Sequence, residues 1–244
     1  MPGQAMGFGI HFGRHAHAMD ITLWFTTFGS DIAAVSLSAV ILTAYYLWLR
    51  IQGRRNPTFS IHSVNQTART LWVMNVMRNP AKDVMAVQTL RNFIMGASLM
   101  ASTATLLIIG TLTLSGQAES ISRSWHVLNV GSTYAAELWI VKVLCLLVDF
   151  IVAFFAFVMA VRLVNQVVFM ITIQPEPDAH YSLAPKAVAR RLNRAGNLFA
   201  IGLRAFFYAV PLVFWLFGPV FLVLATVGLV LTLQQLDRSE PAHN

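Results

Sequence analysis

The sequence predicts an all-α integral membrane protein, a polytopic helical bundle of about four spans with long helices that project into the cytoplasm. Of its 244 residues, 57% are hydrophobic and 11% are charged, whereas soluble domains carry roughly a quarter charged residues. The charges are also segregated along the chain. Apolar stretches long enough to cross about 30 Å of hydrocarbon alternate with segments in which the arginines gather.

The first span is predicted at about 25–49. Its uncharged run ends at Arg50, and Asp31 is expected to cap the helix at its outer edge. The preceding extramembrane tail, 1–20, is rich in Gly and His and lacks the continuous apolar region of a cleaved signal peptide. We therefore expect the first span to act also as an uncleaved targeting signal.

The second and third spans are predicted at 93–116 and 138–161. Asn79-Pro80 is a typical helix start, so the second helix should begin well before its span and project into the cytoplasm. Its many Ala, Gly, Ser and Thr residues favour an interior packing helix. The third helix should project as well, because apolar residues continue to Ile173 before prolines break the pattern.

The fourth span is predicted at 205–233, as one helix that contains Pro211 and Pro219. Prolines inside a span remove backbone hydrogen bonds and kink the helix, and neighbouring helices can compensate for the loss. We interpret both prolines as kink sites, with a gating hinge as the alternative. The four spans form one membrane domain, 21–237, followed by a short tail, 238–244.

The distribution of Lys and Arg predicts the orientation. The loops 50–92 and 162–204 hold seven and six of these residues, against one in each remaining extramembrane segment. Both long loops should therefore lie in the cytoplasm and both termini outside it. We expect residence in the bacterial inner membrane, with anionic lipid head groups as partners of the basic loops. Nucleic acid is not expected as a partner, because no binding motif accompanies the net charge of +7.

Two segments of the basic loops show helical periodicity. Apolar residues recur at near-helical spacing over 64–76, and a similar segment, 186–204, follows Pro185. Each segment is either an amphipathic helix that lies at the cytoplasmic face or an extension of a neighbouring span. The sequence does not decide between the two interpretations.

A set of polar residues near the spans forms the candidate site for a ligand, a lipid or a pore lining. Its arginines either bind an anion or lipid phosphate, or act as topology anchors, which we favour. Asp149 lies deep in the third span and either serves an ion or proton path or is neutral or locally paired. Lys142, on the same helix face, is expected to snorkel outward. The set comprises Gln88, Arg91, Asn92, Asp149, Arg162, Asn165, Asn197 and Arg204.

Other chemistry has little support. His11, His15 and His17 are weak candidates for a zinc or copper site, and docking of the tail on a partner is the favoured alternative. The spans hold no histidine that could bind haem, and the chain has no nucleophile motif or P-loop. We therefore expect no enzyme activity and no cofactor. The single cysteine, Cys145, excludes a disulfide framework.

Several motifs resemble the uncharacterised membrane protein family DUF599, which occurs in bacteria and plants. The resemblance covers roughly 31–237, and its most specific motif is the run Gln-Thr-Leu-Arg-Asn at 88–92. It implies four spans in one membrane domain, but no activity, substrate or catalytic residue. Asp149 departs from the family pattern. The other matching residues are 72–74, 86–87, 95–97, Arg162, 165–166, Asn197, Gly202, Arg204, Tyr208, 211–212, Trp215 and 218–219.

The sequence thus favours a structural, assembly or accessory role in a homo-oligomer or a larger membrane complex. Small residues in the spans would supply the contact faces. The alternative is an oligomeric ion channel or small-solute transporter with a cytoplasmic vestibule of Arg, Asn and Gln side chains. Because four spans give too little wall for a path within one chain, this alternative also needs an oligomer.

Overall fold

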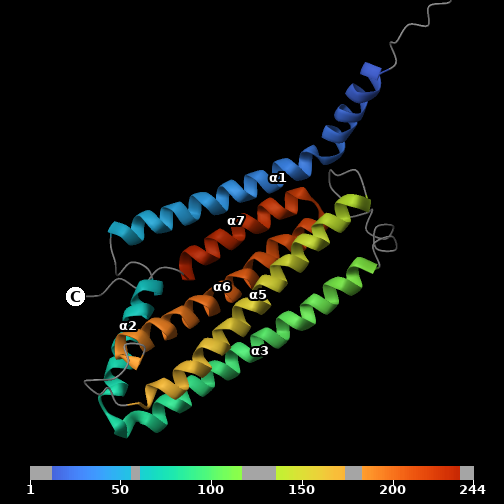
Figure 1. Ribbon diagram of the computed structural model, residues 1–244. Helices are drawn as coiled ribbons and strands as arrows, with labels where there is room; N and C mark the ends of the chain where they lie inside the picture. Colours follow the sequence, from blue (N-terminus) through green and yellow to red (C-terminus); the bar gives the residue numbers. More distant parts are fainter. Residues whose placement is uncertain (1–12, 56–60, 117–135, 174–182, 237–244) are drawn as a thin grey trace, which may run out of the picture.

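The computed structural model describes residues 13–55, 61–116, 136–173 and 183–236, in which all regular structure is helical. Four helices are long and apolar enough to cross a membrane. They lie side by side in an elongated bundle, and consecutive long helices run in opposite directions (Figure 1). The predicted class, an all-α membrane bundle, is confirmed. The four helices are α1 (Gly13–Arg55), α3 (Asp83–Gly116), α5 (Ala136–Ile171) and α6 (Pro185–Phe217).

Two short elements lie at one end of the bundle. The helix α2 (Ile61–Met77) packs mainly on α6, so the periodic segment 64–76 forms a separate helix (Figure 1). The 3-10 helix η1 (Pro80–Lys82) leads into α3, and the Asn79 side chain accepts a hydrogen bond of 3.2 Å from the backbone N–H of Ala81. The predicted helix start at Asn79-Pro80 is therefore confirmed.

The other periodic segment, 186–204, is the first half of α6 and so extends a spanning helix. The predicted span 205–233, in contrast, is not one kinked helix. The helix α6 ends at Phe217, and Gly218 has φ 148°, a region that favours glycine because it has no Cβ atom. Pro219 then stands at the first position of a new helix, where its missing N–H costs nothing.

This new helix, α7 (Pro219–Leu236), runs back along α6 and packs against both α6 and α1 (Figure 1). Its last described turn lies at the same end of the bundle as α2, whereas α1 starts at the opposite end (Figure 1). Residues 205–236 therefore form parts of two antiparallel helices, where the sequence predicted one outward span. Pro211 lies inside α6 without ending it.

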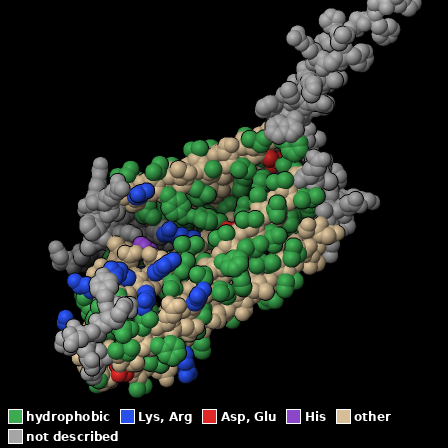
Figure 2. Space-filling model, viewed as in Figure 1, with side chains coloured by type: hydrophobic (Ala, Val, Ile, Leu, Met, Phe, Trp, Pro, Cys, Tyr) green, Lys and Arg blue, Asp and Glu red, His purple; other side chains and the backbone are tan. Residues whose placement is uncertain are grey.

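The largest core lies at the α2 end, where four helices meet, and the basic side chains gather at this same end (Figure 2). Its fully buried members include Val73 of α2, Val164 of α5 and Val188 of α6. Further along, α3 packs on α5 through alanines such as Ala97 and Ala104. Within the single chain α3 is not interior, because it stands at the edge of the bundle and its opposite face is exposed.

Candidate functional site

A buried ion pair joins α1 to α5 and α6 in the half of the bundle away from the basic end. The Lys142 ammonium lies 2.9 Å from Asp31 Oδ1, and both side chains are almost fully buried. Trp215 Nε1–H donates a hydrogen bond of 2.7 Å to the same oxygen, and the centroid of its ring lies 5.3 Å from the Lys142 ammonium. A buried charge needs such partners, because hydrocarbon offers none. We call these three residues the Asp31 lock.

The lock corrects two expectations. Asp31 does not cap the first helix at its outer edge, because α1 already begins at Gly13 and Asp31 lies well inside it. Lys142 does not snorkel to the outer surface, since its side chain points inward to Asp31. The two residues were expected to act separately, and the structure brings them together.

A groove runs beside the lock between α1 and α5, with α6 and α7 as its floor. A cavity of about 260 Å³ lies in it, lined on α1 by Val35 and Ser38, on α5 by Cys145 and on α7 by Leu222 and Thr226. Figure 2 shows the same face hollowed between α1 and α5. The lining is almost entirely apolar, so the cavity suits hydrocarbon better than water. We call it the α1–α5 groove.

Two polar groups on the walls of this groove have no hydrogen-bond partner among the described residues. One is the buried hydroxyl of Ser38 on α1, and the other is Oδ2 of Asp149 on α5. Lys142, Cys145 and Asp149 follow one another along one face of α5. Because Lys142 reaches α1 and Cys145 lines the cavity, this face is directed toward the groove. Asp149 is half-buried there.

The groove is bounded toward the basic end by two tyrosines and an arginine. The hydroxyls of Tyr46 on α1 and Tyr208 on α6 form a hydrogen bond. The Arg204 guanidinium lies 5.6 Å from the centroid of the Tyr46 ring, a distance at which a cation and an aromatic face attract. Arg204 was expected as a boundary anchor or an anion ligand, and here it also holds α1 against α6.

The residues of the predicted cytoplasmic vestibule lie on α3, α5 and α6. Asn197 accepts a 3.4 Å hydrogen bond from Gln66 of α2 and lies next to the core. Gln88, Arg91 and Asn92 are exposed on α3, and Arg162 and Asn165 are exposed on α5. None of these five forms a hydrogen bond or an ion pair with another described side chain. The vestibule, which would need an oligomer, therefore stays a prediction.

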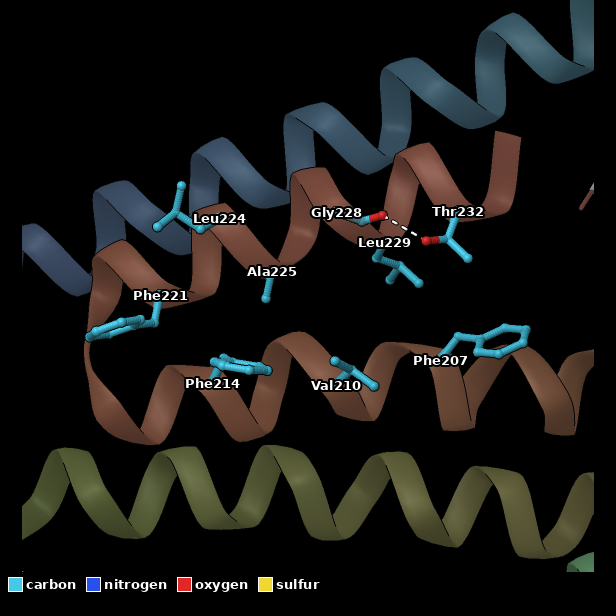
Figure 3. Close-up of a pocket in the computed structure, with 9 residues that line it drawn as sticks. All are labelled: Phe207, Val210, Phe214, Phe221, Leu224, Ala225, Gly228, Leu229 and Thr232. Carbon is cyan, nitrogen blue, oxygen red and sulfur yellow. Dashed lines mark hydrogen bonds between the residues drawn. The ribbon is translucent and has the colours of Figure 1, made fainter. Parts of the chain in front are cut away.

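A second cavity, of about 540 Å³, lies between α6 and α7 (Figure 3). Phe207, Val210 and Phe214 line it from α6, and residues of α7 from Phe221 onward line it from the other side. Its one hydroxyl, that of Thr232, is already bonded to the Gly228 carbonyl at 3.0 Å. The cavity therefore offers only apolar contacts and no chemistry.

The last kind of predicted site is a metal site. No group of three His, Cys, Asp or Glu residues able to hold a metal ion occurs in the described part of the chain. His11, His15 and His17 belong to the stretch whose side chains lie outside the described residues. The zinc or copper prediction for them stays a prediction.

Sequence reasoning missed the Asp31 lock, although the chain carries a signal for it. Asp31 precedes Arg50, at the basic end of its helix, by 19 residues, and Lys142 precedes Arg162 by 20. In two parallel helices, equal spacing from the same end means equal depth in the membrane. Opposite charges at equal depth indicate a possible ion pair between the two helices.

Comparison with known proteins agrees with the architecture and leaves the activity open. No curated protein and no solved structure matches the chain significantly. One family model, described as a protein of unknown function, matches residues 33–242, which include the groove, Lys142 and Trp215 but not Asp31. The chain is therefore a member of the DUF599 family.

Proposed function

We propose that the protein is a subunit of a homo-oligomeric membrane assembly in which a second copy covers the α1–α5 groove. The observation that supports this is the pair of unpartnered polar groups, Ser38 Oγ and Asp149 Oδ2, on the walls of a groove at membrane depth. A polar group in hydrocarbon costs about 2 kcal/mol or more when it has no hydrogen-bond partner. Lipid tails can fill the apolar cavity but offer neither donor nor acceptor.

A second copy would supply polar partners as well as apolar contact. The exposed face of α3 has suitable chemistry for close helix contact, because Gly96 and Gly110 have nothing within 4 Å of the position where a side chain would begin. Between these glycines, Thr103 is exposed as well. This face gives the assembly a second contact surface in addition to the groove.

The experiment is extraction of the protein with its native lipids into nanodiscs, followed by mass measurement of the particles. We expect multiples of the 27.0 kDa chain. Asp149→Asn should shift the distribution toward the monomer, while the matched variant Asp83→Asn, at the start of α3, should not. A particle that holds one chain at every protein concentration tested contradicts the proposal.

A second candidate function is conduction of an ion or proton through the assembly, and Asp149 is the observation that favours it. An ionisable side chain within a span and without a partner typically marks an ion path. In liposomes we expect Asp149→Asn to abolish flux and Asp83→Asn to leave it unchanged. Flux that is equal in both variants, or absent from an oligomeric wild-type protein, contradicts this candidate.

For the orientation we propose that the basic end lies in the cytoplasm of a bacterium, where Lys and Arg side chains meet anionic lipid. The start of α1 would then be outside and the end of α7 inside, because these ends are at opposite ends of the bundle (Figure 1). A green fluorescent reporter fused after residue 244 should fold and fluoresce. An exported reporter that is active only in the periplasm should be inactive at the same position.

A further inference from the structure

A third cavity, of about 410 Å³, lies at the basic end between α2, α3 and α6. It is separate from the α1–α5 groove, while its lining residue Thr89 lies on the face of α3 that also carries Gly96. The helix α2 crosses the end of the bundle there (Figure 1) and packs mainly on α6, with little contact to α3. The lining residues are Ala68, Arg69, Trp72, Thr89, Leu90, Phe93 and Leu192.

The single charged group in this lining, Arg69, is held in place by neighbouring helices. Its Nε–H donates a hydrogen bond of 3.0 Å to Asn193 Oδ1, and the Asn193 amide donates in turn to the Thr70 hydroxyl at 3.0 Å. The guanidinium also lies directly over Gly196, where a Cβ atom would come within 1.9 Å of Nη1. The position of the guanidinium thus depends on a glycine and on an amide that is itself oriented.

The charge of Arg69 is not neutralised within the described part of the chain. No Asp or Glu forms an ion pair with it, and Nε is its one nitrogen with a hydrogen bond there. Burial lowers the pKa of this guanidinium, so the protein holds a partly desolvated cation. Its two terminal nitrogens form no hydrogen bond with a described residue, and together they match the spacing of oxygens on a phosphate or carboxylate.

The other walls of the cavity are hydrocarbon. Trp72 and Phe93 present aromatic rings, and Leu90 and Leu192 belong to the buried core. The Thr89 hydroxyl already donates a hydrogen bond of 2.9 Å to the Met85 carbonyl. An inorganic anion would gain nothing from such walls. A molecule with an acidic head and an apolar chain would use both the cation and the walls.

We propose that this cavity binds an acidic amphiphile, with its phosphate or carboxylate on Arg69 and its hydrocarbon chain along Trp72 and Phe93. A lipid of the cytoplasmic leaflet and a free fatty acid share this chemistry. The site would tie α2, which packs mainly on α6, to the membrane surface. The proposal does not depend on the assembly or on conduction.

The test is native mass spectrometry of the purified full chain, titrated separately with phosphatidylglycerol, oleate, phosphatidylcholine and inorganic phosphate. We expect the two acidic amphiphiles, which carry a net negative charge, to bind at least tenfold more tightly than phosphatidylcholine, because its choline cation offsets the charge of its phosphate opposite Arg69. Tighter binding by phosphatidylglycerol identifies the lipid source, and tighter binding by oleate the fatty acid.

Two variants separate the head of the ligand from its chain. Arg69→Gln should weaken both acidic amphiphiles by about tenfold or more, while Arg78→Gln, at an exposed arginine just after α2, should change binding less than twofold. Thr89→Trp should block the cavity with Arg69 intact, and its exposed position allows the chain to fold. Wild-type binding by both Arg69→Gln and Thr89→Trp overturns the proposal. So does inorganic phosphate that binds as tightly as the amphiphiles.

Discussion

Asp31 and Asp149 are two carboxylates in the same bundle, and the protein treats them differently. One oxygen of Asp31 receives an ammonium at 2.9 Å and an indole N–H at 2.7 Å, from two other helices. The other oxygen of Asp31 and one oxygen of Asp149 are both buried without a hydrogen-bond partner, but Asp149 receives no hydrogen bond from a described residue at either oxygen. The acid with partners holds helices together, whereas the acid without them is available to a second molecule. Partners, and not depth alone, decide which role an acid in a membrane has.

The largest expected effect follows from breaking the Asp31 lock. Asp31→Asn leaves the buried Lys142 ammonium without a counter-charge, so the free energy of unfolding should fall by about 3–5 kcal/mol. Denaturation in mixed micelles with increasing SDS measures this change. The double variant Asp31→Leu with Lys142→Met should recover most of the loss, because it removes both charges together. A double variant as unstable as the single one would show that the ion pair is not the source of the stability.

The next effect comes from the third member of the lock. Trp215→Phe keeps an aromatic ring over the ammonium and removes the N–H that Asp31 accepts. We expect a loss of about 1–3 kcal/mol in the same assay. Trp72→Phe is the control, because the indole nitrogen of Trp72 makes no hydrogen bond among the described residues, and it should cost less. Equal losses would assign the effect of Trp215 to ring size alone.

A smaller effect on stability is expected at the open site. Asp149→Asn breaks no described interaction, so the free energy of unfolding of the monomer should change by less than about 1 kcal/mol. The same variant should reduce the oligomer fraction in nanodiscs. Asp31→Asn should reduce this fraction only to the extent that it increases the fraction of unfolded protein. A loss as large as that of Asp31→Asn would mean that Asp149 has a structural partner, and the contrast between the two acids would fail.

The spans and their common basic end could be predicted because hydropathy and charge act locally along the chain. The hairpin at Gly218 could not, since apolar residues stand on both sides of it and fit one kinked helix as well as two helices. Length is the signal that decides. By Phe217 the helix from Pro185 already has 33 residues, about 50 Å, and α7 adds another 18, about 27 Å. A single helix that crosses the membrane once does not need both lengths.

The candidate site was harder to predict for a different reason. Asp149 was found from its charge alone, because a single ionisable residue in a span needs no knowledge of its neighbours. The Asp31 lock and the Arg69 cavity depend on which helices are adjacent. No local sequence pattern indicates that Gly196 of α6 lies against the Arg69 guanidinium of α2. Gly196 precedes Asn197, for which the sequence suggested only a place in the vestibule lining.

The most direct test of the central claim, that a second copy covers the α1–α5 groove, uses the one cysteine of the chain. Cys145 lines the groove and is exposed in the single chain. In native membranes, bismaleimides of increasing spacer length should convert the protein to a covalent dimer of twice 27.0 kDa. Cys145→Ser should give none. Complete labelling of Cys145 by a monofunctional maleimide, without dimer at any spacer length, would contradict the account.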